Sequence, residues 1–75
     1  MRTVKFVSSS NKAMEERFKD KMMLAVSQSD MSIKFLATDG SNDGFKTSKI
    51  VNTRRVDNYI VYATQNSTYT FELYA

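Results

Sequence analysis

The side chains that most often carry catalysis are missing from this chain of 75 residues, which contains no histidine and no cysteine. Ser-His-Asp and Cys-His triads, zinc hydrolase sites and CxxC redox sites are therefore excluded. Carboxylates remain for acid–base chemistry, but Glu15, Glu16 and Asp20 alternate with lysines, a pattern typical of a solvated helix face. We therefore expect a binding protein that is not an enzyme and uses no cofactor.

The segment 39–44, Asp-Gly-Ser-Asn-Asp-Gly, matches the first six positions of an EF-hand loop, with oxygen ligands at one, three and five and glycine at six. The match stops there, because position twelve is Ile50 where a bidentate glutamate would close the site. Both glycines of the chain lie in this segment. We favour a turn over a calcium site and predict no metal.

Positive charge gathers in residues 44–56, which hold four cations and no acidic residue, within a formal net charge of +3. Together with the nearby Tyr59, they form a candidate phosphate-contacting patch with an aromatic ring for stacking. The alternative is that the cations protect a strand edge and keep the protein in solution. The predicted binding residues are Lys46, Lys49, Arg54, Arg55 and Tyr59.

The methionines offer a second candidate surface, because their side chains reshape readily around a partner. Met14, Met22, Met23 and Met31 are spread over the first half of the chain. We favour a role in filling a small core. Met23 and Leu24, however, fall outside the main apolar stripe of the helix expected here, and either could face a partner.

The first half of the chain predicts a strand at 3–7 followed by a helix from Asn11 to Gln28. Residues 8–11, Ser-Ser-Ser-Asn, supply capping side chains, and Glu15 and Glu16 place negative charge in the first turn. The apolar stripe of this helix would be Met14, Phe18, Met22, Ala25 and Val26.

The second half predicts strands at 31–38, 45–56, 58–64 and 68–74, with tight turns at 57–58 and 66–67. The turns pair Val56 with Tyr59 and Tyr62 with Phe71. One face then collects the apolar set Val51, Ile60, Tyr62, Tyr69, Phe71 and Leu73, and the other face is polar. We expect a single α+β domain over residues 1–75, with one amphipathic helix packed on an antiparallel sheet in the order β-α-β-β-β-β.

The lack of cysteine fits a reducing compartment, and the first residues lack the apolar run of a signal peptide. No apolar segment approaches the ~20 residues needed to cross a bilayer. We therefore expect a cytoplasmic protein with no membrane partner.

Three segments, Thr47-Ser-Lys-Ile50, Tyr59-Ile-Val-Tyr-Ala-Thr64 and Asn66-Ser-Thr-Tyr-Thr-Phe-Glu-Leu73, resemble the C-terminal β meander of short accessory proteins of phages and prophages of Gram-positive bacteria. The resemblance covers about a third of the chain and carries no catalytic residue. Some such proteins inhibit host defences, including CRISPR effector nucleases. The resemblance thus implies a protein that binds and inhibits a host protein in the host cell.

Two other functions remain open from the residues. One is nucleic-acid binding through the basic stretch. The other is a structural phage component that forms homo-oligomers through an exposed strand edge.

Overall fold

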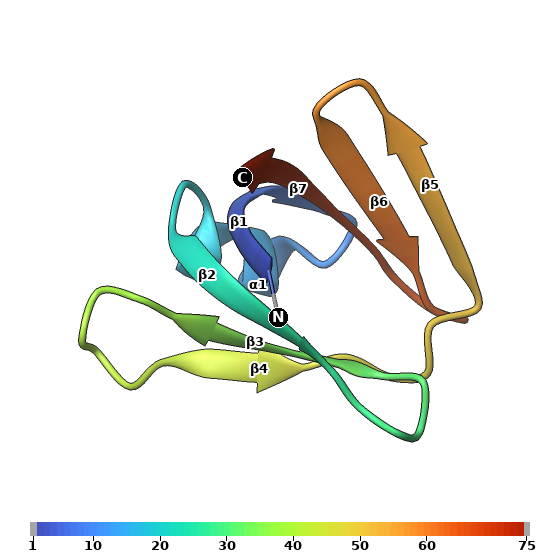
Figure 1. Cartoon of the computed structure of the whole chain (residues 1–75), viewed down its shortest axis with the longest axis horizontal. Helices are drawn as coiled ribbons and strands as arrows, with labels where there is room; N and C mark the ends of the chain where they lie inside the picture. The colour runs from blue at the N-terminus through green and yellow to red at the C-terminus, as the bar shows by residue number, and fades with distance from the viewer. Residues whose placement is uncertain (1, 75) are drawn as a thin grey trace.

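The computed structural model describes residues 2–74, which form one helix and seven strands. In chain order they are β1 (Arg2–Ser9), α1 (Lys12–Phe18), β2 (Met22–Ser27), β3 (Ile33–Ala37), β4 (Gly44–Lys46), β5 (Asn52–Val56), β6 (Tyr59–Ala63) and β7 (Thr68–Tyr74). The strands make one sheet in the order β4-β3-β2-β1-β7-β6-β5, and every pair in it is antiparallel (Figure 1). The α+β class and the helix on an antiparallel sheet are confirmed, with two more strands than expected.

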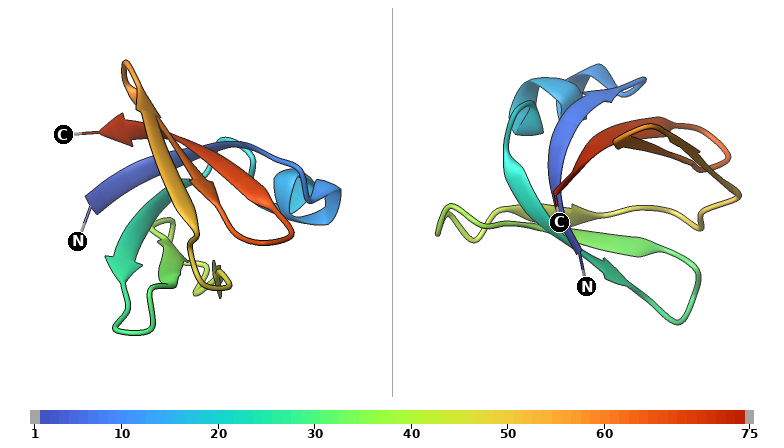
Figure 2. Two further views of the ribbon diagram at one scale, coloured as in Figure 1. Left: turned by 90° about the vertical axis from the view of Figure 1, so that its right-hand side faces the viewer. Right: turned by 45° about the horizontal axis from the view of Figure 1, so that its top comes forward.

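The sheet curls strongly, so that β1 and β7 form its back and two wings project from it (Figure 2). We call β2, β3 and β4 the first wing, and β5 and β6 the second wing. Residues 47–51 cross from one wing to the other. The Ile50 amide donates to the Met31 carbonyl at 2.9 Å, and the Val51 amide donates to the Ala63 carbonyl at 2.8 Å. This crossing holds the two wings together at one end.

The concave side of the sheet holds an aromatic core. Phe6, Phe18, Phe35 and Phe71 are completely buried. The rings of Phe35 and Phe71 stack with centroids 4.3 Å apart, and Phe6 meets Phe71 edge-on at 5.2 Å. Phe35 comes from the first wing and Phe71 from the back, so this packing ties residues distant in the sequence into one core.

The helix predicted from Asn11 to Gln28 is wrong in its second half, because α1 ends at Phe18. Its start is as expected, since the Asn11 side chain accepts a hydrogen bond from the Met14 amide at 3.2 Å. Asp20 then adopts a left-handed conformation with φ of 66°, which aspartate tolerates better than most residues and which stops the helix. No helix among residues 2–74 is long and apolar enough to cross a membrane.

Residues 22–27 form β2 because their backbone pairs with β1 on one side and with β3 on the other. Met23 pairs with Val4 on one side and with Ala37 on the other. Met23 and Ala25 are buried, whereas Met22, Leu24 and Val26 are half-buried. This alternation is that of a strand. The spacing of apolar residues here fitted a helix equally well, and backbone pairing decided between the two. Met23, a candidate for partner contact, is completely buried.

Four of the five predicted strands, 3–7, 31–38, 58–64 and 68–74, correspond to β1, β3, β6 and β7. Ile33 and Phe35 are buried on one side of β3, as predicted for residues 31–38. Residues 39–44 form the predicted turn into β4, where Gly40 has a φ of +82°. The predicted strand 45–56 is instead divided into β4 and β5 by the crossing at 47–51.

The hairpins confirm which residues face the core but not every pairing. Val56 pairs with Tyr59 and Arg55 with Ile60, as predicted. The predicted two-residue turn at 66–67 is wrong. The loop into β7 has four residues, 64–67, and is closed by a hydrogen bond from the Thr64 amide to the Ser67 carbonyl. Tyr62 therefore pairs with Tyr69 rather than Phe71. A shift of two residues leaves the faces unchanged, so the predicted apolar set is buried, except for Val51, which is 62% exposed in the crossing.

Candidate functional site

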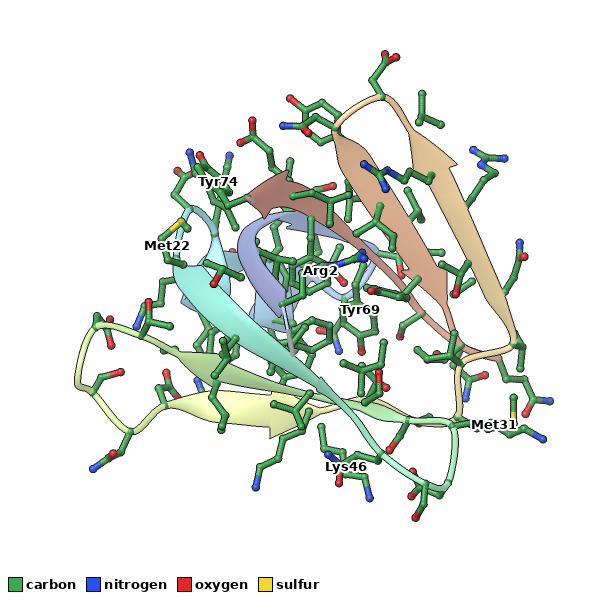
Figure 3. The ribbon with its side chains drawn as sticks, viewed as in Figure 1. Arg2, Met22, Met31, Lys46, Tyr69 and Tyr74 are labelled. Atoms are coloured by element: carbon green, nitrogen blue, oxygen red, sulfur yellow. The ribbon has the colours of Figure 1, made fainter. Side chains whose placement is uncertain are left out.

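The structure divides the predicted basic patch between the two edges of the sheet. Lys46 lies on β4, where its Nζ is 3.0 Å from the Asp30 carboxylate, and Lys49 lies in the crossing. Arg54 and Arg55 lie on β5, at the opposite edge. Figure 3 shows Lys46 on the side of the first wing, away from β5. The four cations therefore do not form one continuous surface.

On β5 itself, the two arginines point to opposite faces because strand side chains alternate. Arg54 pairs with Val61 and shares the convex face with Tyr59, which is 43% exposed. Arg55 pairs with the buried Ile60 and so lies at the concave face. Of the five predicted residues, the structure keeps Arg54, Arg55 and Tyr59 together on the second wing.

The carboxylates of the first wing and of the segments beside it are paired with nearby cations, although Lys34 on β3 forms no ion pair among residues 2–74. Asp43 is paired with Arg17 and lies 3.9 Å from Lys21, and the Arg17 side chain holds the pKa of Asp43 below its ordinary value. Hydrogen bonds from Ser32 and then from Lys46 lower the pKa of Asp30. The carboxylates of this region are therefore already engaged within the protein.

On the second wing, where there are no carboxylates on β5 or β6, neither arginine forms an ion pair within the described residues. Among residues 2–74, no carboxylate lies within 4.0 Å of Arg54 or Arg55. Within the part of the chain that the structure describes, the Arg55 side chain makes one hydrogen bond, in which its Nε donates to the Asp57 carbonyl at a long distance of 3.4 Å. All five residues of β5 are exposed, and the strand ends the sheet (Figure 1). Its outer edge offers backbone hydrogen-bonding groups beside two uncompensated positive charges.

The two adjacent arginines oppose pairing of β5 with a second copy of itself. In an antiparallel pair centred on this strand, Arg54 or Arg55 would lie directly opposite or diagonal to an arginine of the other copy. Like charges in those positions are destabilising. The same positions would favour a strand that carries acidic residues.

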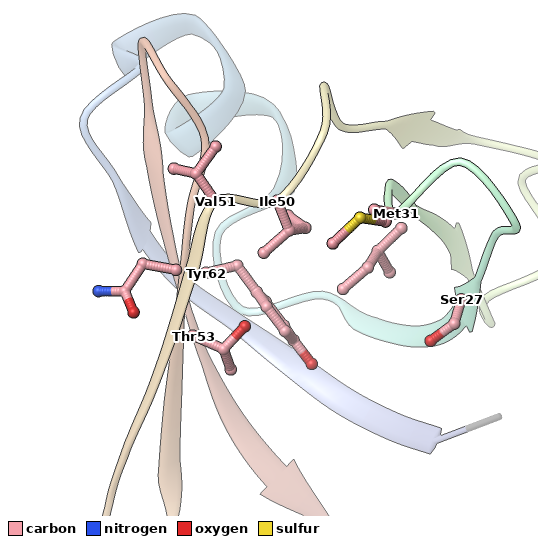
Figure 4. Close-up of a pocket in the computed structure, with 8 residues that line it drawn as sticks. Ser27, Met31, Ile50, Val51, Thr53 and Tyr62 are labelled. Atoms are coloured by element: carbon pink, nitrogen blue, oxygen red, sulfur yellow. The ribbon is translucent and has the colours of Figure 1, made fainter.

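A cleft consists of three hollows that share residues. It begins between the two wings and ends beside β1, β7 and the turn between β5 and β6. The largest hollow, of about 520 Å³, is lined by parts of both wings and of the crossing (Figure 4). Its walls are Ser27, Met31, Ile33, Ile50, Val51, Asn52, Thr53 and Tyr62. A second hollow of about 290 Å³ adds Arg2 and Ala25, and a third of about 210 Å³ is lined by Arg2, Arg55, Asn58, Leu73 and Tyr74.

The cleft has an apolar end and a positively charged end. Met31 and Val51, at the first end, are 59% and 62% exposed. Arg2, the first residue of β1, lines both the second and the third hollow, and its side chain extends away from β1 toward the second wing (Figure 3). Arg2 also has no carboxylate within 4.0 Å among the described residues. This arrangement suits a ligand with an apolar part and an anionic part.

Tyr62 lies where the first two hollows meet, and its ring crosses the cleft wall in Figure 4. Burial raises the pKa of its hydroxyl, partly offset by the positive charge of Arg2. The hydroxyl therefore stays protonated at neutral pH and can donate a hydrogen bond to a ligand.

Sequence reasoning missed Arg2, Ile50, Val51 and Tyr62 as cleft residues. Arg2 is remote in sequence from the basic stretch, and nothing in its neighbourhood indicates that β1 leads to the cleft. Tyr62 was assigned to the core, which is correct for most of its ring. Two cleft residues did carry a signal: Met31, through the methionine surface considered above, and Arg55, which lines the third hollow and was among the predicted binding residues.

Chemically, these surfaces can bind anionic and apolar groups. Within the part of the chain that the structure describes, no three acidic side chains come together as metal ligands would. The chain matches no protein-family model, and comparison with curated proteins and with solved structures finds no match.

Proposed function

We propose that this chain is a protein-binding module without enzymatic activity, which binds and inhibits a host protein in the cytoplasm of the host cell. It takes an acidic, extended segment of that protein as an additional strand beside β5. The observation that carries this proposal is the edge strand itself, fully exposed and with two arginines that form no ion pair among residues 2–74.

Strand addition supplies both parts of the recognition. The backbone of the added strand completes the hydrogen bonds of the β5 edge, which gives affinity without regard to sequence. Selectivity comes from Arg54 and Arg55, because a guanidinium binds a carboxylate through two parallel hydrogen bonds. Adjacent residues of an extended segment point to opposite faces, as the two arginines do.

A nucleic acid fits this surface less well than a peptide strand. Binding along a phosphate backbone needs several cations along one line. Here Lys46 is engaged by Asp30 at the other edge of the sheet, and the two arginines face away from each other. The resemblance of residues 47–73 to phage accessory proteins supports inhibition of a host factor as the outcome of binding.

Binding can be tested with a synthetic octapeptide, Thr-Thr-Glu-Glu-Thr-Thr-Thr-Thr, titrated into the isotopically labelled protein. We expect NMR shift changes at the amides of residues 52–56. The changes should be lost in an Arg54→Glu/Arg55→Glu variant. They should persist in a matched Lys19→Glu/Lys34→Glu variant, which makes the same charge change at exposed cations elsewhere.

Two results would contradict the proposal. One is the absence of shift changes on β5, or equal changes with a lysine-containing peptide. The other is preferential binding of an oligothymidylate probe, with an affinity that falls by a log–log slope of about −0.7 per phosphate contacted as salt is raised. That second result would assign the surface to single-stranded nucleic acid.

Inhibition needs a separate assay. The protein would be mixed with effector nucleases of Gram-positive hosts, including CRISPR effectors, and DNA cleavage would be measured. We expect co-elution with one effector and loss of its cleavage activity, both abolished by the Arg54→Glu/Arg55→Glu variant. Failure to co-elute with or inhibit any effector tested would argue against inhibition of this class of partner.

A further inference from the structure

We infer that the cleft and β5 together recognise one sequence pattern in the partner strand: two adjacent acidic residues, then two residues of any kind, then a large apolar residue. This inference rests on the proposed function and specifies the chemistry of its partner. It follows from the order of the three hollows along β5.

The hollows follow the direction of the edge strand. The first is lined by Val51, Asn52 and Thr53, at the start of β5, and the third is lined by Arg55, near its end. Tyr62 and Arg2 line the second hollow between them. A segment that lies along β5 therefore passes the apolar end of the cleft and the charged end in a fixed order.

At the charged end, Arg55 and Arg2 line the same hollow of about 210 Å³. A partner residue opposite Arg55 has its side chain on the concave face, toward this hollow. A carboxylate there can be bound by two guanidinium groups that have no carboxylate partner within residues 2–74. The next residue of the partner faces Arg54 on the convex side, so a second acidic residue fits there.

At the other end, Met31 and Val51 are more than half exposed, and Ile50 lies beside them. Exposed apolar side chains that gather around a hollow gain stability when another apolar group covers them. A leucine-sized side chain opposite Val51 would cover both residues. The apolar end of the cleft thus selects the second part of the pattern.

The direction and the spacing follow from strand geometry. Every pairing within this sheet is antiparallel, and antiparallel pairing is the more stable arrangement. A partner residue opposite Arg55 is then followed four positions later by the residue opposite Val51. The two lie on the same face about 13 Å apart, at ~3.3 Å for each residue.

The pattern can be tested by measuring the affinities of three octapeptides by calorimetry. The first, Thr-Glu-Glu-Thr-Thr-Leu-Thr-Thr, carries the pattern. The second moves the leucine one position later, which turns it to the opposite face. The third reverses the order of the first. We expect the first to bind about tenfold more tightly than the other two, since one buried leucine accounts for about that factor.

Variants of the protein test which end of the cleft binds the leucine and which end binds the first glutamate of the peptide. Met31→Ser/Val51→Thr should lower affinity for the first peptide about tenfold and leave affinity for the leucine-free octapeptide unchanged. Arg2→Gln should reduce the affinity for the first peptide. It should have a smaller effect on the affinity for a version of that peptide that has glutamine in place of its first glutamate. Both variants change exposed side chains, and circular dichroism would verify that they fold.

Each outcome separates the inference from the proposed function. Equal affinity for the three peptides would overturn the pattern while leaving strand addition at β5 standing. Tighter binding of the reversed peptide would overturn the antiparallel direction that the pattern requires. Failure of every acidic peptide to bind would contradict the proposed function and the pattern with it.

Discussion

The edge strands of the two wings differ in length and in whether their cationic side chains form ion pairs. In the first wing, the edge strand β4 has only three residues, and its Lys46 is paired with Asp30. In the second wing, the edge strand β5 has five exposed residues, and its two arginines pair with no carboxylate of residues 2–74. A very short edge strand is one way in which proteins protect an edge against unwanted pairing, and charged side chains such as those of Arg54 and Arg55 are another. The longer, fully exposed edge of the second wing is the basis of the strand-addition proposal made above.

The largest effect should come from the core contact between the first wing and the back of the sheet. Phe35→Ala removes a completely buried ring that stacks on Phe71, and we expect a loss of about 3–5 kcal/mol in the free energy of unfolding. Val56→Ala, on the exposed edge strand, should change it by less than about 0.5 kcal/mol. Urea denaturation measures both.

If Phe35→Ala leaves too little folded protein to measure, Phe35→Leu gives a smaller loss in the same direction. A Val56→Ala loss as large as that of a core residue would break the comparison between the wings. It would mean that the second edge contributes to folding.

The next effect concerns the tight contact of β4 with β3. A Cβ added at Gly44 would lie 2.5 Å from the Phe35 carbonyl oxygen, so Gly44→Ala must displace backbone. We expect a loss of about 1–3 kcal/mol in the free energy of unfolding. Hydrogen exchange at the amides of β3 would show whether the loss is local to the first wing. Unchanged stability would mean that β4 is held loosely.

Acidification should act on the first wing through its engaged carboxylates. Hydrogen bonds from Ser41, with help from Lys21, lower the pKa of Asp39 to about 2 from an ordinary value of 3.8, and the pKa of Asp30 is lowered as well. A carboxylate with a lowered pKa stabilises the folded state above pH 4 and loses that effect as the pH falls toward 2.

We therefore expect the thermal midpoint to fall between pH 4 and pH 2. The fall should be smaller in an Asp30→Asn/Asp39→Asn variant, as followed by circular dichroism. An equal fall in both proteins would show that these carboxylates do not contribute to the stability of the first wing.

The smallest effect should come from the apolar end of the cleft. Met31→Ser and Val51→Thr change side chains that are 59% and 62% exposed, so each should shift the free energy of unfolding by less than about 0.5 kcal/mol. A loss above about 1 kcal/mol would indicate that these residues stabilise the fold. The exposed apolar surface would then need no partner to explain it.

The sequence predicted the local features that depend on neighbouring residues. The cap at Asn11, the turn at 39–44 and the hairpin at 57–58 all form as expected. The apolar face of residues 60–73 was also correct, although its second hairpin is longer than predicted. Strand side chains alternate between the two faces of the sheet, so a shift of two residues in the pairing leaves each side chain on its predicted face.

Residues 22–27 show where such reasoning fails. Their apolar spacing is compatible with a helix face and with a strand, and the high helix propensity of methionine, leucine and alanine favoured the helix. The outcome depended on Val4 and Ala37, which are distant in sequence and provide backbone partners on both sides.

The sequence by itself determined that this protein has neither histidine nor cysteine chemistry, that it is one helix on an antiparallel sheet, and that positive charge is concentrated in residues 44–56. The tertiary structure alone decided how those charges are used. Lys46 and Arg54 are eight positions apart in the chain, yet the curled sheet places them at opposite edges, one paired and one not. Charge composition is a property of the chain, whereas compensation depends on which distant residues the sheet brings within a few ångströms.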